Sequence, residues 1–322
     1  MFVSILHDAC MTLDAVASRF LAWAETAYRR EDGEPTREAG NCELALRTLR
    51  AMYGAESIDN VGYKHLLAVR DALEVAGKYH RNTINQRVGV WKRFIRWALD
   101  ARLCSPQTKS EWWAMGNLAR LRSTAKESVP VGPVPHWMVK AVLPRVSATA
   151  AAMIRVQELC GARPGEICSM RFCDVERRRR VWVYRPASHK TTHRDQIRVI
   201  VLGPRARAVL LAYLGKIDWR SDAPVFPPAE IPKRRPAHPN HRTPIAYSQV
   251  IRGAARTAGI EHWTPNQLRH ACGTRVRRRF GRDMASVVLG HAHGQRITDR
   301  YTRNAIEAEL ISTATRAMLR LG

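Results

Sequence analysis

The sequence predicts an α+β protein that is mostly helical, with an all-α domain followed by a mixed α/β domain that holds a small three-stranded sheet. Residues 10–125 carry apolar side chains at helical spacing, whereas three short runs rich in β-branched residues lie between 169 and 202. Residues 126–135 contain serine, glycine and three prolines, which interrupt the helical pattern. We therefore place a linker at 126–135, between a helical domain at 10–125 and a second domain at 134–322.

Four or five helices are expected in the first domain. Apolar spacing and cap residues predict four of them at 13–28, 36–53, 58–76 and 83–103. The last of these follows a candidate N-cap, Asn82. It is also the most regular, because one face carries an apolar stripe made of Ile84, Val88, Trp91, Ile95 and Ala98.

The second domain is expected to begin with two helices, at 136–146 and 148–159, and Gly161 is placed to end the second of them. Three strands are then predicted, at 169–175, 181–185 and 196–202. A helix is expected at 204–214, followed by an irregular, proline-rich segment at 223–244. The remaining helices are expected at 247–257, 265–279, 284–289 and 305–319.

The net charge narrows the class of partner. The chain has 53 Lys and Arg against 28 Asp and Glu, a formal net charge of +25 at pH 7, which favours a polyanionic partner. No apolar run approaches the roughly 18 residues that a membrane-spanning helix needs, so we expect nucleic acid and no membrane. The seven cysteines have irregular spacings and no C-x-x-C pair, which indicates neither a disulfide framework nor a zinc site. The start of the chain has no secretion signal, so the expected location is the cytoplasm.

Four motifs in the second domain carry candidate chemistry. Arg163 lies in a tight turn rich in glycine and proline, Gly161-Ala162-Arg163-Pro164-Gly165-Glu166. It is followed in chain order by Asn266-Gln267-Leu268-Arg269-His270, Leu289-Gly290-His291 and Thr298-Asp299-Arg300-Tyr301. Together, in this order and spacing, the motifs resemble those of the tyrosine recombinase family, also called the phage integrase family. The resemblance covers almost the whole chain.

The resemblance implies both a fold and a set of catalytic residues. It makes the helical domain a core-DNA-binding domain and the second domain a tyrosine recombinase catalytic domain. Arg163 and Arg269 match the family's two catalytic arginines, and Tyr301 matches its nucleophile. His291 matches a position that holds His or Trp, and Lys190, in the loop between the second and third strands, matches the lysine of the family's β-hairpin.

Two positions depart from the family pattern. Asn266 stands where the family usually has the histidine of His-x-x-Arg. Because an amide cannot exchange a proton near neutral pH, Asn266 can donate a hydrogen bond to a phosphate oxygen but cannot act as a general base. The spacing from His291 to Tyr301 is one residue longer than the family's, and Gly294 lies where a loop would absorb the extra residue.

The chemistry asks for these residue types independently of the family. Attack of a tyrosine hydroxyl on a phosphodiester adds negative charge to the nonbridging oxygens, and the planar guanidiniums of Arg163 and Arg269 can bind those oxygens bidentately. His291 and Asn266 can add hydrogen bonds. Lys190 can protonate the departing 5′ oxygen. The expected product is a 3′-phosphotyrosyl enzyme, which a free 5′ hydroxyl can reverse, so no cofactor is required.

The expected function is therefore site-specific DNA strand cleavage and rejoining, by a recombinase or integrase of a mobile genetic element or by a recombinase of chromosome or plasmid resolution. The resemblance implies double-stranded DNA with specific recombination sites as partner, a homotetramer on that DNA, and a location at the nucleoid. Two alternatives stay open: a noncatalytic DNA-binding protein that keeps the fold, which Asn266 favours, and a topoisomerase-like enzyme that relaxes DNA. A covalent protein–DNA adduct separates the first alternative from both enzymes.

Several side chains have open roles. Candidate contacts with the DNA backbone are Asn85, Lys92, Arg96, Arg275 and Arg278, each of which can equally be a solvated surface residue. Glu166 is either an ion-pair partner of Arg163 or a surface residue, and His270 is assigned to packing or to support of the site. The apolar face of residues 304–321 can pack on its own domain or on a neighbouring protomer.

Overall fold

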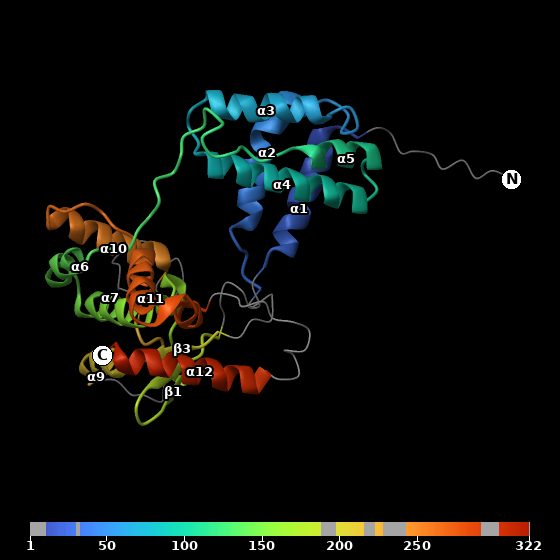
Figure 1. Cartoon of the computed structure of the whole chain (residues 1–322). Coiled ribbons are helices and arrows are strands. Elements are labelled where there is room, and N and C mark those ends of the chain that lie inside the picture. Colours follow the sequence, from blue (N-terminus) through green and yellow to red (C-terminus); the bar gives the residue numbers. More distant parts are fainter. Residues whose placement is uncertain are drawn as a thin grey trace. The chain divides into compact units, whose positions relative to one another are not determined.

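The computed structural model describes residues 11–29, 33–187, 198–215, 223–227, 243–290 and 303–321. The chain divides into two compact units, Met1–Pro130 and Val131–Gly322, which are described separately (Figure 1). Within the described residues, no helix is long and apolar enough to cross a membrane. The expected fold class, mostly helical with a small three-stranded sheet, is confirmed.

The first unit is built from helices, and each of the four predicted helices is present. The bounds are α1 Leu13–Ala27, α2 Glu38–Tyr53, α3 Tyr63–Val75, α4 Arg81–Asp100 and α5 Pro106–Ala114. The last of these, α5, is the fifth helix for which the prediction left room. Ser105 caps it and Pro106 occupies its first turn, but only Thr108 and Trp112 are buried, so the helix is too short to show an apolar period.

The core of the first unit forms around α4. All five residues of its apolar stripe are buried, as the spacing predicted. Trp91 lies among them, and its indole N–H donates to the carbonyl of Ala45 on α2 at 2.9 Å. The indole of Trp112 donates to the carbonyl of Val61 at 2.6 Å. The two large aromatic side chains are therefore buried without leaving a polar N–H unpaired, which ties α2 and α5 to the rest of the unit.

The segment that was expected to link the two units is partly packed. The backbone N–H of Arg81 donates to the carbonyl of Lys126, and the Arg81 side chain pairs with Glu127 at 2.7 Å. At the other end, Val134 is buried in the core of the second unit. Residues 126–128 thus contact the first unit, and Val134 belongs to the second.

The second unit surrounds the small sheet with helices. Before the sheet come α6 His136–Val142, α7 Ala148–Cys160 and α8 Pro164–Cys168, and after it come α9 Pro204–Leu214, α10 Pro244–Thr257, α11 Pro265–Leu289 and α12 Arg303–Arg320. The sheet has the order β1-β2-β3, with strands β1 Val175–Arg177, β2 Trp182–Tyr184 and β3 Ile200–Leu202, and both pairings are antiparallel.

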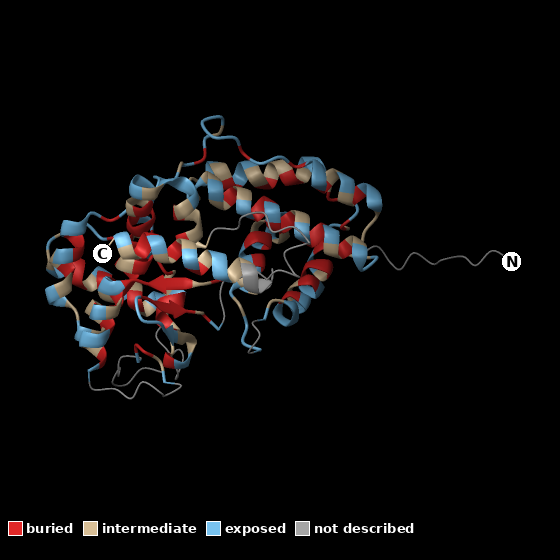
Figure 2. Ribbon diagram, turned by 60° about the horizontal axis from the view of Figure 1, so that its bottom comes forward, coloured by how far each residue is buried: buried red, intermediate tan, exposed pale blue. Residues whose placement is uncertain are grey.

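Both faces of β2 and β3 are covered, whereas β1 is a largely exposed edge strand (Figure 2). Trp182 and Tyr184 alternate with Val183 along β2, and β2 pairs with β3 in the register Val183↔Val201. The Trp182 and Tyr184 side belongs to the main core of the unit, whereas Val201 on the other side packs with residues of α11 and α12. A strand buried on both sides has no polar alternation, which is why it appears in the sequence as a short apolar run.

The first strand begins later than predicted. The sequence placed it at 169–175, but Phe172–Asp174 form a 3₁₀ turn and β1 starts at Val175. Arg171 explains the difference, because its guanidinium makes two hydrogen bonds to the Asp174 carboxylate, at 2.9 and 3.0 Å, and closes the turn. Apolar composition alone does not reveal such a local ion pair.

The last two helices complete the unit. The break expected between 279 and 284 is present in α11 at Gly281, whose φ of +87° no helix allows. In α12, Ile311, Ala314 and Met318 are buried, and Ala314 and Met318 pack with the second face of the sheet and with α11. The later part of this apolar face is thus buried within its own unit, whereas Ile306 and Leu310 near its start are half-buried.

Candidate active site

Arg163 lies in a turn that a glycine and a proline make rigid. Gly161 ends α7 with a φ of +69°, a conformation that favours glycine, and a Cβ there would lie 3.0 Å from atoms of Cys272 and Leu289 on α11. Pro164 then begins the short helix α8, for which Arg163 is the N-cap residue. The Arg163 side chain is 22% exposed. The backbone on either side of this arginine is therefore constrained, which fixes the position from which its side chain extends.

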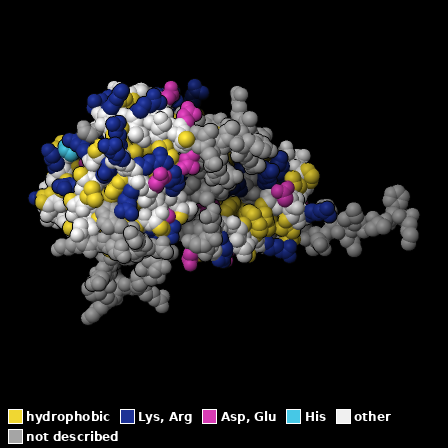
Figure 3. Space-filling view, turned by 90° about the horizontal axis from the view of Figure 1, so that it is seen from below, with side chains coloured by type: hydrophobic (Ala, Val, Ile, Leu, Met, Phe, Trp, Pro, Cys, Tyr) yellow, Lys and Arg dark blue, Asp and Glu magenta, His cyan; other side chains and the backbone are white. Residues whose placement is uncertain are grey.

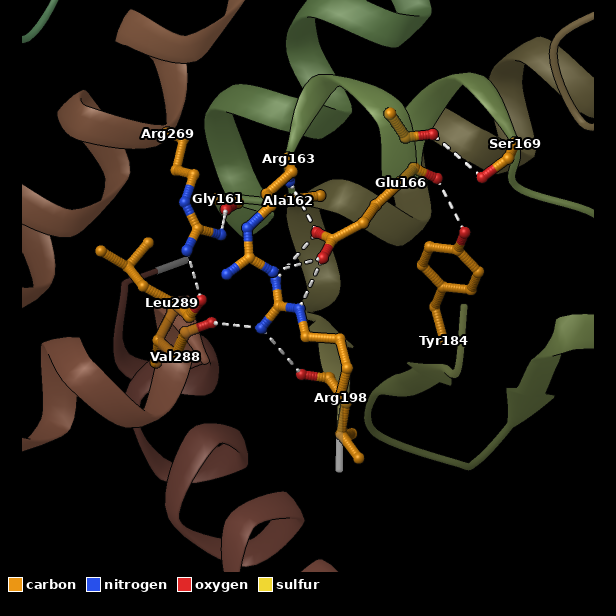
Figure 4. Close-up of polar contacts among 12 residues, drawn as sticks. Gly161, Ala162, Arg163, Glu166, Ser169, Tyr184, Arg198, Arg269, Val288 and Leu289 are labelled. Atoms are coloured by element: carbon orange, nitrogen blue, oxygen red, sulfur yellow. Dashed lines mark hydrogen bonds and ion pairs between the residues drawn. The ribbon is translucent and has the colours of Figure 1, made fainter. Parts of the chain in front are cut away.

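Glu166 holds the Arg163 side chain (Figure 4). One carboxylate oxygen, Oε2, accepts the backbone N–H of Arg163 at 2.6 Å, and the other, Oε1, accepts its Nη1 at 2.8 Å. The Glu166 side chain is only 3% exposed. Burial raises the pKa of this carboxyl, but Arg198 and Arg163 lower it more, to about 2, so Glu166 is ionised at neutral pH. The sequence left open whether Glu166 is an ion-pair partner of Arg163 or a surface residue, and in the structure it is the ion-pair partner.

Arg269 is buried beside this turn. It lies on α11 and is 6% exposed. Its Nη1 donates to the carbonyl of Gly161 at 2.9 Å, and its Nη2 donates to the carbonyl of Leu289 (Figure 4). Burial, followed by the charges of Arg198 and Arg163, lowers the pKa of Arg269 to about 10, which leaves it charged at neutral pH. Arg163 and Arg269, far apart in the sequence, thus belong to one cluster.

A third arginine in the cluster was not predicted. Arg198 lies two residues before β3, and its guanidinium donates to both oxygens of Glu166, at 2.9 and 3.0 Å. Its Nη1 also reaches the carbonyl of Val288 at 3.4 Å. The only signal in the sequence is a basic residue directly before the apolar run that becomes β3, and nothing in that run indicates that the arginine is buried.

Three of the expected catalytic residues lie outside the described residues. These are Lys190, His291 and Tyr301. The described chain ends directly before His291: Gly290 ends α11 with a φ of +60°, and Leu289 and Val288 accept the hydrogen bonds from Arg269 and Arg198. The roles of these three residues stay predictions.

Asn266 is described, and it lies in the first turn of α11. Its side chain is exposed, and its Nδ2 is 3.1 Å from Nε2 of His270, one helical turn further on. His270 is exposed as well, so its expected role in packing is wrong, and the other choice, support of the site through Asn266, stays a prediction. Within the described ranges, no three His, Cys, Asp or Glu side chains gather closely enough to hold a metal ion.

The expected DNA contacts fall into two groups. Asn85 and Arg275 are engaged within the fold: the Asn85 amide exchanges two hydrogen bonds with the backbone of Leu118, at 2.7 and 3.1 Å, and Arg275 pairs with Glu158 at 3.4 Å. The others lie at the surface, where Arg96 and Arg278 are exposed and the Lys92 ammonium lies 5.6 Å from the ring of Trp113. None of the five is thereby shown to contact DNA.

The chain matches one family profile. The profile describes the phage integrase family and matches residues 139–307, more than half of the 322-residue chain. The chain belongs to the phage integrase family. The resemblance found in the sequence motifs is thereby confirmed, and the Arg163 turn, Arg198 and Arg269 all lie within the matched residues. A comparison with curated proteins gives no match.

Solved integrase structures share the fold of this phage integrase family member. A lambda integrase (75-356) dimer bound to a COC' core site is 12% identical, with a TM-score of 0.64, and the match covers 88% of this chain and 96% of that one. A lambda integrase tetramer bound to a Holliday junction is 11% identical, with a TM-score of 0.64 and coverage of 91% and 78%.

The Tn1549 transposon integrase (aa 82-397) in complex with circular intermediate DNA is 14% identical, with a TM-score of 0.61 and coverage of 93% and 99%. At these identities the likeness shows the fold alone. It nevertheless extends over both units of the chain, and not only over the part that the family profile matches.

Proposed function

We propose that this protein is a site-specific DNA recombinase that cleaves and rejoins DNA strands through a 3′-phosphotyrosyl intermediate. The observation that carries the proposal is the buried arginine cluster, in which backbone carbonyls hold Arg269 and the Glu166 carboxylate holds Arg163. Donors fixed in this way need no rearrangement when charge develops on a phosphate, and such preorganisation is a large contribution to catalysis.

In the proposed reaction, the Tyr301 hydroxyl attacks the phosphorus and the bond to the 5′ oxygen breaks. Arg163 and Arg269 stabilise the charge on the nonbridging oxygens, and hydrogen bonds from His291 and Asn266 assist them. Lys190 gives a proton to the departing 5′ oxygen. The phosphotyrosine ester retains a phosphoester bond, so a 5′ hydroxyl from the same or another strand reverses the step without a cofactor.

The proposed partner is double-stranded DNA that carries specific recombination sites. Solved relatives in this fold are bound to DNA, and one is a tetramer on a Holliday junction, which supports a homotetramer as the working form. The charge of the chain fits, since Lys and Arg cover more of the described surface in Figure 3 than Asp and Glu do. The proposed setting is a mobile genetic element whose DNA lies in the nucleoid.

The test is adduct formation on nicked duplexes made from the repeats that flank the gene. Cleavage next to a nick releases a short strand that diffuses away, so the covalent protein–DNA complex accumulates and survives denaturing electrophoresis. We expect an adduct, and exchange between two such sites on plasmids. An intact, DNA-binding protein that forms no adduct would favour the noncatalytic alternative. Relaxation of supercoiled plasmid without exchange would favour the topoisomerase-like one.

The departure at Asn266 gives a prediction of its own. If its amide only donates a hydrogen bond to the phosphate, Asn266→Ala slows single-turnover cleavage by about 10-fold, and Asn266→His preserves or raises the rate and adds a titration near pH 6.5. The measurement is the cleavage rate against pH for the three proteins. Full activity of Asn266→Ala at every pH would remove this residue from the chemistry.

A further prediction concerns the proposed DNA contacts of α4. Lys92→Ala and Arg96→Ala should each lower the slope of log affinity against log salt concentration by about 0.9, because each contact releases counterions from the duplex. Asn85→Ala is the matched control on the same helix. It should leave the slope unchanged and lower the free energy of unfolding by about 1–3 kcal/mol, because the backbone N–H of Leu118 loses its acceptor. An unchanged slope in both basic variants would place the DNA elsewhere.

A further inference from the structure

Arg163 and Arg269 form the proposed phosphate clamp, and Arg198 is buried to the same degree as Arg269 and more deeply than Arg163. Its side chain is 2% exposed, against 22% for Arg163. All three nitrogens of its guanidinium already donate to groups of the protein, so Arg198 is not assigned a contact with the DNA phosphate. It must instead be explained by its neighbours, because burying an unpaired charge costs several kcal/mol.

The partners of Arg198 come from two separate parts of the site. Its Nε and Nη2 bind the two oxygens of Glu166 in the Arg163 turn, and its Nη1 reaches the carbonyl of Val288 near the end of α11. Its guanidinium also lies against Gly290, where any side chain would collide with it. Figure 4 shows Arg198 between the Arg163 turn and the end of α11. One side chain thus connects the turn, the start of β3 and the residue before His291.

The same arrangement determines the net charge of the group formed by Arg163, Glu166 and Arg198. An ion pair between Arg163 and Glu166 alone would be neutral, and a neutral pair binds a phosphate poorly. Each Glu166 oxygen, however, accepts one hydrogen bond from Arg163 and one from Arg198. With two guanidiniums on one carboxylate, the group keeps a net positive charge. Arg163 is then held in place by Glu166 without losing its attraction for an anion.

Arg198 and Arg269 also act together on α11. They donate to the neighbouring carbonyls of Val288 and Leu289, which lie in the last turn of that helix. Cations are stabilised at a helix C-terminus, where carbonyl groups have no partner in the helix. The backbone that leads directly into His291 is therefore fixed by two buried guanidiniums, one from the segment just before β3 and one from α11 itself.

We propose that Arg198 is a positioning residue of the recombinase site: it balances the Glu166 carboxylate, so that Arg163 stays both fixed and positively charged toward the DNA phosphate, and it anchors the chain before His291. This inference rests on the proposed function. It assigns to the segment before β3 a part in the chemistry that neither the sequence motifs nor the clamp arginines require.

The test compares Arg198→Lys, Arg198→Met and the double variant Glu166→Gln/Arg198→Met with the wild-type protein. Single-turnover cleavage at saturating nicked duplex, affinity for that duplex and thermal unfolding are measured for each. Arg198→Met should lower the cleavage rate by about 100-fold while affinity changes less than about 3-fold. Arg198→Lys keeps the charge but cannot bind both oxygens and the Val288 carbonyl, so an intermediate loss of about 10-fold is expected.

The double variant separates the charge role from a merely structural one. Removing Arg198 leaves the Glu166 carboxylate to neutralise Arg163, whereas a Gln at 166 still accepts a hydrogen bond and carries no charge. Cleavage should therefore recover by about 10-fold or more relative to Arg198→Met, measured well below the unfolding temperature of each protein. The proposal would be overturned if the cleavage rate of the double variant did not recover and the rates of the variants depended only on the fraction of folded protein. If Arg198→Met does not fold, Arg198→Lys against the double variant decides the same question.

A pH profile gives a second signature. Glu166 faces the guanidiniums of Arg163, Arg198 and Arg269, and Tyr184 and Cys160 lie near it. Burial raises its pKa and Arg198 is the main group that lowers it, so the pKa should rise in Arg198→Met. Protonation of Glu166 then frees the charge of Arg163, and the rate of Arg198→Met divided by that of wild type should increase as the pH falls toward 5. A ratio independent of pH would contradict the charge role.

Failure of the proposed function would look different. In that case the wild-type protein forms no adduct, and the role of Arg198 is read from inorganic phosphate binding, measured by calorimetry with Arg163→Lys as the control for the clamp. Affinity should fall in Arg198→Met and return in the double variant. Equal phosphate affinities in the three proteins would overturn the inference. If the wild-type protein does cleave DNA, a wild-type cleavage rate in folded Arg198→Met would overturn it as well.

Discussion

A protein with Tyr301→Phe is expected to form no covalent adduct with a nicked recombination site and to bind that site with nearly wild-type affinity. The change removes one hydroxyl, which is the proposed nucleophile, and leaves the arginine cluster untouched. The expected loss is complete within detection, since no other group at this position can form a phosphoester. Denaturing electrophoresis of the labelled duplex measures the adduct, and a mobility shift measures binding.

The described tyrosines of the second unit serve as controls for this assignment. Tyr184 and Tyr247 are buried, and their hydroxyls donate to the Glu166 carbonyl at 2.7 Å and to Gln157 at 2.9 Å. Burial raises the pKa of both phenols, which opposes formation of a nucleophilic phenolate. Tyr213 donates to the Thr149 hydroxyl at 3.1 Å. An adduct peptide that contained any of the three, or an undiminished adduct in Tyr301→Phe, would contradict the proposed nucleophile.

The fold was predictable where side-chain periodicity is long and one-sided. The stripe on α4 spans several turns and faces one core, so spacing alone located both the helix and its buried side. Short elements were harder to place. The 9-residue helix α5 buries only two side chains, and the start of β1 depends on an ion pair between Arg171 and Asp174. Local contacts of this kind leave no periodic trace in a sequence.

The candidate site also contains residues that the sequence predicted and one that it did not. The motifs indicated Arg163 and Arg269 because a known family arranges such residues in a fixed order, and the structure brings both into one cluster. Arg198 belongs to no motif that we recognised, and its partner Glu166 lies on the other side of β1 and β2 in the chain. An arginine that is buried because a distant carboxylate meets it becomes visible only once the sheet and the turn are folded together.

Replacing either clamp arginine by lysine should lower the rate of cleavage by about 100-fold or more, because lysine keeps the charge but loses the planar, bidentate donor. The two variants should differ in stability. Arg163 is partly exposed, and a lysine there can still approach Glu166. Arg269 is buried with two backbone carbonyls as acceptors, those of Gly161 and Leu289, so Arg269→Lys should also reduce the free energy of unfolding by about 1–3 kcal/mol.

The comparison is made by single-turnover cleavage, DNA affinity and thermal unfolding, with Arg277→Lys, an exposed arginine of the same helix as Arg269, as the matched control. Near wild-type cleavage by Arg163→Lys would remove that residue from the phosphate clamp. For Arg269→Lys, a loss of cleavage that vanishes at low temperature, where the variant is fully folded, would reduce its role to structure. A loss that persists in the folded protein requires the guanidinium itself, because charge, helix and backbone are then all in place and only the geometry of the donor has changed.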